Sequence, residues 1–144
     1  MQDFPHRYSI EASAKAEGPV AIASPGLAAL QTAAPAEFGG PGDQWSPETL
    51  FVASVADCLV LGFRAIARAS SLPWVSLHCE GEGVLDRVER TTKFTSITLR
   101  ACLTVPEGTD PEKAKRILDK AERSCLVSNS LACPVHLEPQ VEVV

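Results

Sequence analysis

The sequence lacks the excess of basic residues that nucleic-acid-binding proteins carry. Its 144 residues include 13 Lys and Arg against 18 Asp and Glu, which gives a formal net charge of −5 at pH 7. Contact with a phosphate backbone requires a basic face, and none is visible along the chain. We therefore expect no nucleic-acid partner.

Signals for export and for membrane insertion are also missing. The first residues, MQDFPHRYSI, hold no basic segment followed by an apolar run and a small-residue cleavage site. The longest apolar stretch, Leu50–Ile66, is interrupted by Asp57 and Arg64 and is shorter than a bilayer span requires. We expect this stretch in a protein core, with no secretory signal and no membrane partner.

The residues that are present are typical of one globular domain. Apolar residues make up 45% and charged residues 22% of a chain that is too short for two ordinary domains. Five cysteines, an odd number, fit a reducing compartment in which thiols are free. The sequence therefore predicts a single domain over residues 1–144, located in the cytoplasm.

The N-terminal part predicts three short strands followed by a loop. Apolar and polar residues alternate from Tyr8 to Ala14, which indicates a strand with one buried face. Val20–Ser24 and Leu27–Thr32 are predicted as two further strands, with Gly/Pro turns between them. We expect a small antiparallel meander that leads into the Pro/Gly-rich loop Pro35–Gly42.

A long apolar helix follows the loop. Ser46, Pro47 and Glu48 form a strong helix start, because Ser caps, Pro suits the first helical position and Glu favours the positive end of the helix. The helix is predicted to run to about Ser70, a length of roughly 35 Å. Its middle is apolar on nearly every side, so it must be covered all round. We infer that a second copy of the chain helps to cover it.

The C-terminal part predicts a mixture of strands and helices. We expect strands at 75–80 and 96–105, joined through the polar linker Asp86–Thr92. An amphipathic helix capped by Asp110 should follow, and then a short helix from Cys125 to about Leu131 capped by Ser124. A strand at Val135–Val143 is expected last. The fold class is α+β, with a mostly antiparallel sheet and segregated helices.

Two of the five cysteines are candidate reactive thiols. Cys58 lies in the middle of the apolar helix, where a thiol can act simply as a small hydrophobe. Its neighbours Asp57, Ser54 and Arg64 instead indicate an internal polar pocket. Cys125 is predicted at the first position of a short helix, where the dipole and free N–H groups stabilise a thiolate. A purely structural role remains the alternative for both residues.

The other cysteines fit structural roles better. Cys79 is expected on the buried face of a strand, and Cys102 on the polar face of the next strand. Cys133 and His136 have a spacing that suits metal ligands, but no second pair of ligands accompanies them. We expect no metal site and no cofactor.

Two motifs follow one another along the chain. The first consists of Ser46-Pro47-Glu48-Thr49-Leu50 and Ala56-Asp57-Cys58-Leu59, and the second is Cys125-Leu126-Val127-Ser128-Asn129-Ser130. They resemble the (N/S)PE-L…A-C and C-P-x-S-N-A patterns of the OsmC/Ohr family, the osmotically inducible and organic hydroperoxide resistance proteins. The resemblance covers nearly the whole chain, as a single OsmC-like domain, and points to the OsmC-like branch.

This resemblance implies an intertwined homodimer with antiparallel sheets around the long central helix. It further implies a thiol peroxidase in which Cys58 is the peroxidatic thiol, Cys125 the resolving thiol and Glu48 the acid that steadies an arginine. The substrate would be an organic hydroperoxide or hydrogen peroxide, and the reductant an external dithiol such as a lipoylated protein. Glu48 lies about 15 Å from Cys58 along one helix, so it would serve the Cys58 of the other subunit.

The chain departs from the family pattern at two points. Peroxidases of this family place an arginine in the first β-hairpin, whereas the corresponding turn here contains Lys15. Lys15, Arg64 or no residue at all takes the place of that arginine, and Arg68 is expected in solvent. Leu126 also replaces the usual Pro of the second motif.

The missing arginine keeps a second hypothesis open. A non-enzymatic OsmC-like dimer would bind a small apolar or thiol-reactive ligand at its interface, without peroxide turnover. A third reading is a purely structural dimer whose thiols only fill the core.

Overall fold

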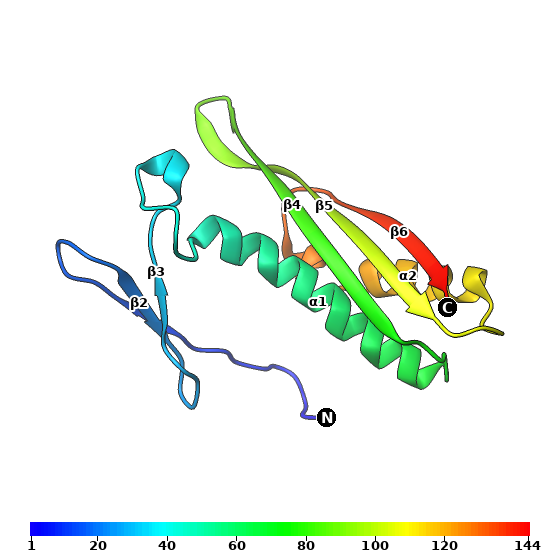
Figure 1. Ribbon diagram of the computed structural model, residues 1–144. Helices are drawn as coiled ribbons and strands as arrows, with labels where there is room; N and C mark the ends of the chain where they lie inside the picture. Colours follow the sequence, from blue (N-terminus) through cyan, green and yellow to red (C-terminus); the bar gives the residue numbers. More distant parts are fainter. The chain divides into compact units, whose positions relative to one another are not determined.

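The chain divides into two units, Met1–Leu50 and Phe51–Val144, in a computed structural model that describes residues 1–144. Each unit contains one three-stranded sheet (Figure 1). The α+β class is confirmed, since the chain combines two α-helices with two sheets. The prediction of a single domain stays a prediction.

The first unit is built around an antiparallel meander in the order β1-β2-β3. β1 spans Glu11–Ser13, β2 spans Val20–Ala23 and β3 spans Leu30–Thr32. The predicted meander is confirmed, but its strands are shorter than expected. Tyr8 and Ile10 precede β1 and are 89% and 71% exposed. Leu27 donates its N–H to the Ser24 carbonyl in a turn, so β3 begins only at Leu30.

The Pro/Gly-rich loop of this unit contains a short 3₁₀ turn, η1, at Ala36–Phe38. Gly39 ends the turn with a φ of 83°, a left-handed conformation that favours glycine. A side chain at Gly40 would collide with the carbonyl group of Ala34. The glycines of this loop therefore fix its path rather than loosen it.

Helix α1 spans Pro47–Ala69 and begins as the sequence predicted. The Ser46 hydroxyl accepts the Thr49 N–H at 3.1 Å, and the Thr49 hydroxyl accepts the Ser46 N–H at 2.9 Å. This reciprocal pair is a capping box with Thr in the place of the usual Glu or Gln. At the other end, Leu72 donates its N–H to the Ala67 carbonyl, and Pro73 prevents any continuation.

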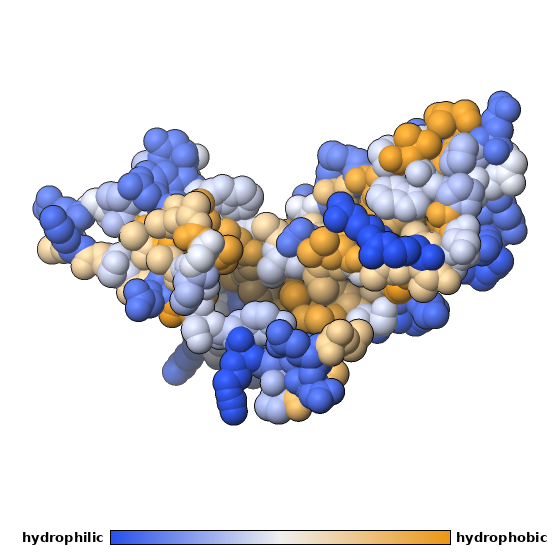
Figure 2. Space-filling model, turned by 90° about the horizontal axis from the view of Figure 1, so that it is seen from below, coloured by the Kyte–Doolittle hydropathy of each residue, from blue (hydrophilic) through white to orange (hydrophobic).

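Only one stripe of α1 is buried within the chain. Val55, Leu59, Phe63 and Ala67 repeat at every fourth residue and are fully covered. By length and composition alone α1 is apolar enough to cross a membrane, a property that core helices of soluble proteins share. Seen from below, apolar surface is visible in the region that α1 occupies (Figure 2).

The second unit has a sheet in the order β4-β5-β6. β4 (Ser76–Val88) pairs antiparallel with β5 (Thr91–Val105), and β5 pairs parallel with β6 (Val135–Val143). Helix α2 (Pro111–Arg123) connects β5 to β6, as a parallel pair requires a crossover. The predicted linker Asp86–Thr92 is wrong, because the strands stay paired up to Val88 and Thr91.

The β4–β5 hairpin turns on two residues with positive φ, Glu89 at 50° and Arg90 at 71°. This is the geometry of a type I′ turn, which usually contains Asn and Gly. The Asn/Gly signal is absent from the sequence, and the turn was therefore missed.

Both helices contribute to one hydrophobic core with the sheet. Side chains from α1, β5 and α2 form the fully buried part, including Phe63, Leu99 and Leu118. Val52 and Ala56 of α1 lie against Gly81 and Gly83 of β4, where a side chain would leave too little room. The two glycines therefore permit close approach of α1 to the sheet.

Candidate redox site

The second unit brings Cys58 and Cys125 together. Cys58 lies on α1, beside the buried stripe, and is partly covered. Cys125 is 3% exposed and follows α2. The Cys125 side chain lies close enough to the Cys58 thiol to raise its pKa, and both thiols are free. Neighbouring thiols from sequence-remote segments are a requirement of a reversible disulfide.

The predicted local structure at Cys125 is wrong. Cys125 does not begin a helix, because Ser124 is the C-terminal cap of α2 and its hydroxyl donates to the Lys120 carbonyl at 2.8 Å. The Cys125 N–H donates to the Glu122 carbonyl at 3.1 Å. A short 3₁₀ turn, η2, starts only at Ser128 and ends at Ser130. The argument from a helix dipole at Cys125 therefore does not apply.

Backbone N–H groups of this segment face Cys58 instead. Burial is the main cause that raises the pKa of the Cys58 thiol, and the hydrogen bond and charge of Cys125 raise it further. The N–H groups of Val127 and Leu126 act in the opposite direction and lower the pKa of Cys58. The segment after Cys125 thus supplies donors that stabilise negative charge on the Cys58 sulfur. Sequence reasoning placed these donors on the wrong cysteine.

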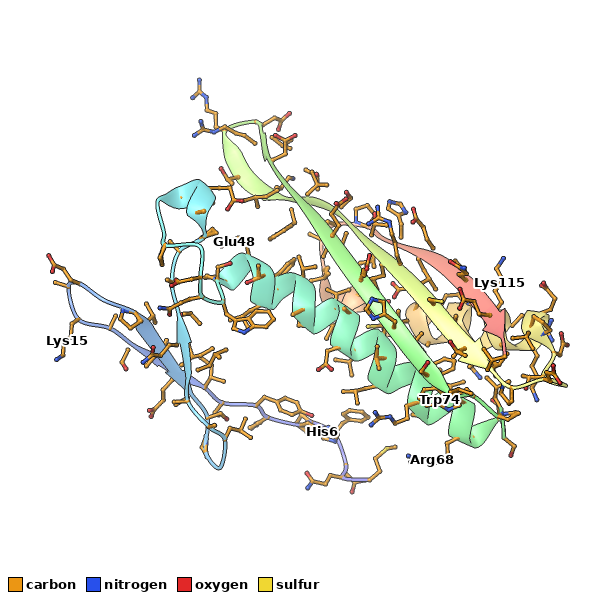
Figure 3. The ribbon with its side chains drawn as sticks, viewed as in Figure 1. His6, Lys15, Glu48, Arg68, Trp74 and Lys115 are labelled. Atoms are coloured by element: carbon orange, nitrogen blue, oxygen red, sulfur yellow. The ribbon has the colours of Figure 1, made fainter.

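Glu48 lies in the first turn of α1 (Figure 3). Its Oε2 atom is covered and has no hydrogen-bond partner within the chain. A covered carboxylate oxygen without a donor is costly, so a donor from outside this chain would stabilise it. This is the property expected of an acid that pairs with a cation of another subunit.

The three basic residues considered as replacements for the missing arginine are all exposed. Lys15 lies in the turn between β1 and β2, and Arg68 lies in the last turn of α1 (Figure 3). Arg64 is exposed on the same helix, as are Asp57 and Ser54. The internal polar pocket predicted from Asp57, Ser54 and Arg64 is therefore not formed within the chain.

The remaining cysteines lie outside the pair. Cys79 packs against the core, as predicted, and burial with the charges of Glu122 and Glu80 raises its pKa to about 11. Cys102 lies near Glu142, and limited burial and this carboxylate raise the pKa of Cys102. No group of three or more His, Cys, Asp or Glu side chains is placed to hold a metal ion.

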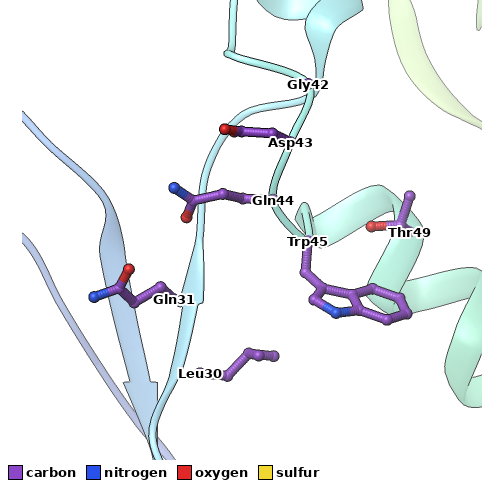
Figure 4. A pocket seen from close by; sticks show the side chains of 7 residues that line it. All are labelled: Leu30, Gln31, Gly42, Asp43, Gln44, Trp45 and Thr49. Carbon is purple, nitrogen blue, oxygen red and sulfur yellow. The ribbon is translucent and has the colours of Figure 1, made fainter.

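A pocket in the first unit is separate from these thiols. It is lined by β3 and by the loop before α1, with Gln31, Asp43 and Gln44 around Trp45 (Figure 4). No cysteine contributes to its lining. Its polar amide and carboxylate groups offer no nucleophile for redox chemistry.

Comparison with solved structures shows which proteins share this fold. An OsmC-like protein of unknown function from Vibrio cholerae superposes with a TM-score of 0.85 at 19% identity, over 94% of this chain and 99% of that chain. An organic hydroperoxide resistance protein from Legionella pneumophila gives a TM-score of 0.75 at 25% identity, over 97% of this chain and 99% of that chain.

Comparison of sequences gives the same result. YmaD from Bacillus subtilis is 25% identical over 112 residues, which are 76% of this chain and 75% of YmaD. The family model described as OsmC-like protein matches residues 40–140, a range that includes both cysteines of the pair. The chain therefore belongs to the OsmC-like protein family.

Proposed function

We propose that this protein is a thiol-dependent peroxidase that reduces organic hydroperoxides. The observation that carries the proposal is the pairing of the Cys58 and Cys125 side chains. It is supported by the likeness to the Legionella pneumophila protein, which is described as an organic hydroperoxide resistance protein. Hydrogen peroxide is a second substrate of the same chemistry.

The reaction proceeds in three balanced steps. The Cys58 thiolate attacks the O–O bond, the alkoxide leaves and takes up a proton as an alcohol, and Cys58 becomes a sulfenic acid. The Cys125 thiol then displaces the sulfenic hydroxyl, which releases water and forms the disulfide. An external dithiol reduces the disulfide through a mixed disulfide and is itself oxidised. A lipoylated protein is the reductant that the family resemblance implies, and no cofactor is needed.

The Leu126 and Val127 N–H groups have a role in the first two steps. Their effect on Cys58 favours the thiolate over the thiol. The same donors can stabilise a sulfenate oxygen or sulfur while Cys125 approaches. An ordinary thiol is only a few per cent ionised at pH 7, so stabilisation of the thiolate matters for the rate.

We further propose that the working unit is a homodimer in the cytoplasm. Within one chain only 22% of the apolar window of α1 is buried, so the helix needs cover from a second copy. Glu48 would then act beside the Cys58 of the partner subunit, where its unpaired Oε2 meets a cation. Five free thiols are consistent with a reducing compartment.

Turnover of cumene hydroperoxide with dihydrolipoamide as reductant tests the activity. We expect Cys58→Ser to abolish turnover. Cys125→Ser should accumulate a Cys58 sulfenic acid that dimedone traps. Cys102→Ser, which removes a thiol on another face of the sheet, serves as the control and should retain turnover. Equal hydroperoxide consumption by the wild type and Cys58→Ser would contradict the proposal.

Two observations favour the alternative of a non-enzymatic binding protein. No arginine lies in the β1–β2 turn, and burial raises the pKa of Cys58 rather than lowering it. A protein of this kind would hold a small apolar or thiol-reactive ligand at the dimer interface. Native mass spectrometry distinguishes the two functions: a copurified ligand together with background peroxide turnover supports binding alone.

A further inference from the structure

Two covered side-chain oxygen atoms near the redox site have no hydrogen-bond partner. Glu122 Oε2 and Ser128 Oγ are both covered, and neither has a hydrogen bond at ordinary distance. Ser128 nevertheless lies close enough to Glu122 to lower the pKa of the carboxyl, against burial, which raises it. A covered polar atom left unpaired is costly, so a hydrogen bond between the Ser128 hydroxyl and the Glu122 carboxyl would stabilise both groups.

The pair joins two elements that form the site. Glu122 lies in the last turn of α2, and its backbone carbonyl accepts the Cys125 N–H at 3.1 Å. The Asn129 Nδ2 atom donates to the Arg123 carbonyl at 3.3 Å. The segment Cys125–Ser130 is therefore attached to the C-terminal end of α2 at both of its ends.

Ser128 occupies the middle of this segment and directly follows Val127. The N–H groups of Leu126 and Val127, which lower the pKa of Cys58, belong to the two residues directly before Ser128. On the sheet side, the charge of Glu122 adds to burial in raising the pKa of Cys79 on β4.

We propose that Glu122 is a positioning residue of the redox site: its carboxyl holds the Ser128 hydroxyl and thereby keeps the Leu126 and Val127 N–H groups directed at the Cys58 sulfur. The proposal rests on the proposed function only in taking Cys58 as the reacting thiol. Glu122 itself does not touch the substrate. Either protonation state of the carboxyl can hydrogen-bond a hydroxyl, as donor or as acceptor.

The rate of Cys58 alkylation as a function of pH tests the proposal in the dimeric full-length protein. Iodoacetamide is the probe, and peptide mass spectrometry separates Cys58 from the other thiols. In Glu122→Ala and Ser128→Ala the donors are no longer held. We expect the alkylation midpoint to move to higher pH and the rate at pH 7 to fall roughly two- to threefold. Glu122→Gln, which can still bond Ser128, should stay close to wild type.

Glu112→Ala is the matched control, because Glu112 lies in the first turn of the same helix, at its opposite end. Its alkylation profile should coincide with that of the wild type. Wild-type profiles in both Glu122→Ala and Ser128→Ala would overturn the proposal, as would a Glu122→Gln profile displaced as far as the alanine one. If Glu122→Ala does not fold, the alkylation profile of Ser128→Ala, which is a smaller change, decides between the two outcomes.

This measurement needs no peroxide, so its outcome is independent of turnover. A displaced alkylation profile together with absent peroxidase activity would support the role of Glu122 and contradict the proposed function. The reverse result, full peroxidase activity with unchanged alkylation in every variant, would overturn the role of Glu122 alone.

Discussion

At the scale of single residues, the acidity of Cys58 is set by opposing neighbours. Burial and Cys125 raise the pKa of the thiol, whereas the Val127 and Leu126 N–H groups lower it. The net direction is upward, so within one chain the thiolate is disfavoured. Any further stabilisation has to come from a cation. Arg100 is already paired with Glu82 and Glu138, whereas Lys15, Arg64 and Arg68 form no ion pair within the chain.

Removal of the Cys125 side chain should make Cys58 more acidic. Cys125→Ala removes both the hydrogen bond and the charge that raise the pKa of Cys58 and leaves the backbone donors in place. We expect the midpoint of Cys58 alkylation to move to lower pH in this variant. An unchanged or higher midpoint, measured with iodoacetamide over pH 6 to 10, would contradict the contacts described for the two thiols.

The Glu122 carboxyl should make stability depend on pH. Burial raises its pKa in the folded state, so folding favours the protonated form. The associated stability is present below the ordinary pKa of the carboxyl and is lost as pH rises through the raised value. Glu122→Gln should therefore match the wild type in thermal midpoint near pH 4 and exceed it near pH 8. Equal midpoints at both pH values would refute this expectation.

The residue scale also shows how far the sequence predicts the site. The resemblance to the OsmC/Ohr motifs paired Cys58 with Cys125, and the structure makes their side chains neighbours. The role of Leu126 and Val127 was not predictable, because backbone donors have no sequence signature. Glu122 and Ser128 were missed for another reason: their association depends on how the end of α2 folds against η2, which no local pattern encodes.

At the scale of elements, capping residues predicted the starts of the two α-helices, whereas the helix expected after Ser124 does not form. Ser46 and Asp110 each cap a helix as expected, and Pro follows both caps. The strands were less predictable. Alternation in β4 is interrupted by Gly81 and Gly83, so the prediction ended the strand near Glu80, eight residues before its actual end at Val88. Gly81 and Gly83 leave room for α1, so they are required by tertiary packing rather than by the strand itself.

Close approach of α1 to β4 should make Gly83 intolerant of a side chain. A Cβ at Gly83 would lie 2.7 Å from Val52 Cγ2 and 2.8 Å from Phe94 Cε1. Such overpacking costs about 1–3 kcal/mol, and we expect Gly83→Ala to lower the free energy of unfolding by that amount. Chemical denaturation of the variant provides the measurement.

Gly62→Ala is the matched control for this substitution. Its Cβ would come no closer than 4.0 Å to the Ala121 carbonyl oxygen, and Gly62 lies within α1. Replacement of a helical Gly by Ala stabilises by about 0.5–1 kcal/mol. A Gly83→Ala protein as stable as Gly62→Ala would show that α1 does not pack on β4 as described.

At the scale of the whole molecule, α1 is the apolar element that a single chain leaves partly uncovered. Its buried stripe occupies one side, and Leu61 on the helix is 50% exposed. The sequence predicted this need for cover from the all-round apolar pattern. The arrangement of a second copy is not encoded in any local pattern, since it depends on surfaces from several elements at once.

The dimer should depend on the uncovered side of α1. Light scattering should give twice the chain mass of 15.3 kDa for the wild type. Leu61→Glu places a charge on that side, and we expect it to shift the population to single chains. Val143→Glu changes an equally exposed apolar residue at the end of β6 and should stay dimeric. A wild type with the mass of one chain would refute the dimer.

The central claim is that Cys58 and Cys125 form a disulfide when peroxide oxidises the protein. Mass spectrometry of the intact chain and of its peptides, after one equivalent of cumene hydroperoxide, tests this most directly. The account predicts a loss of about 2 Da per chain and a crosslinked peptide pair containing these two residues. Unchanged thiols, or a disulfide that joins other cysteines, would contradict it.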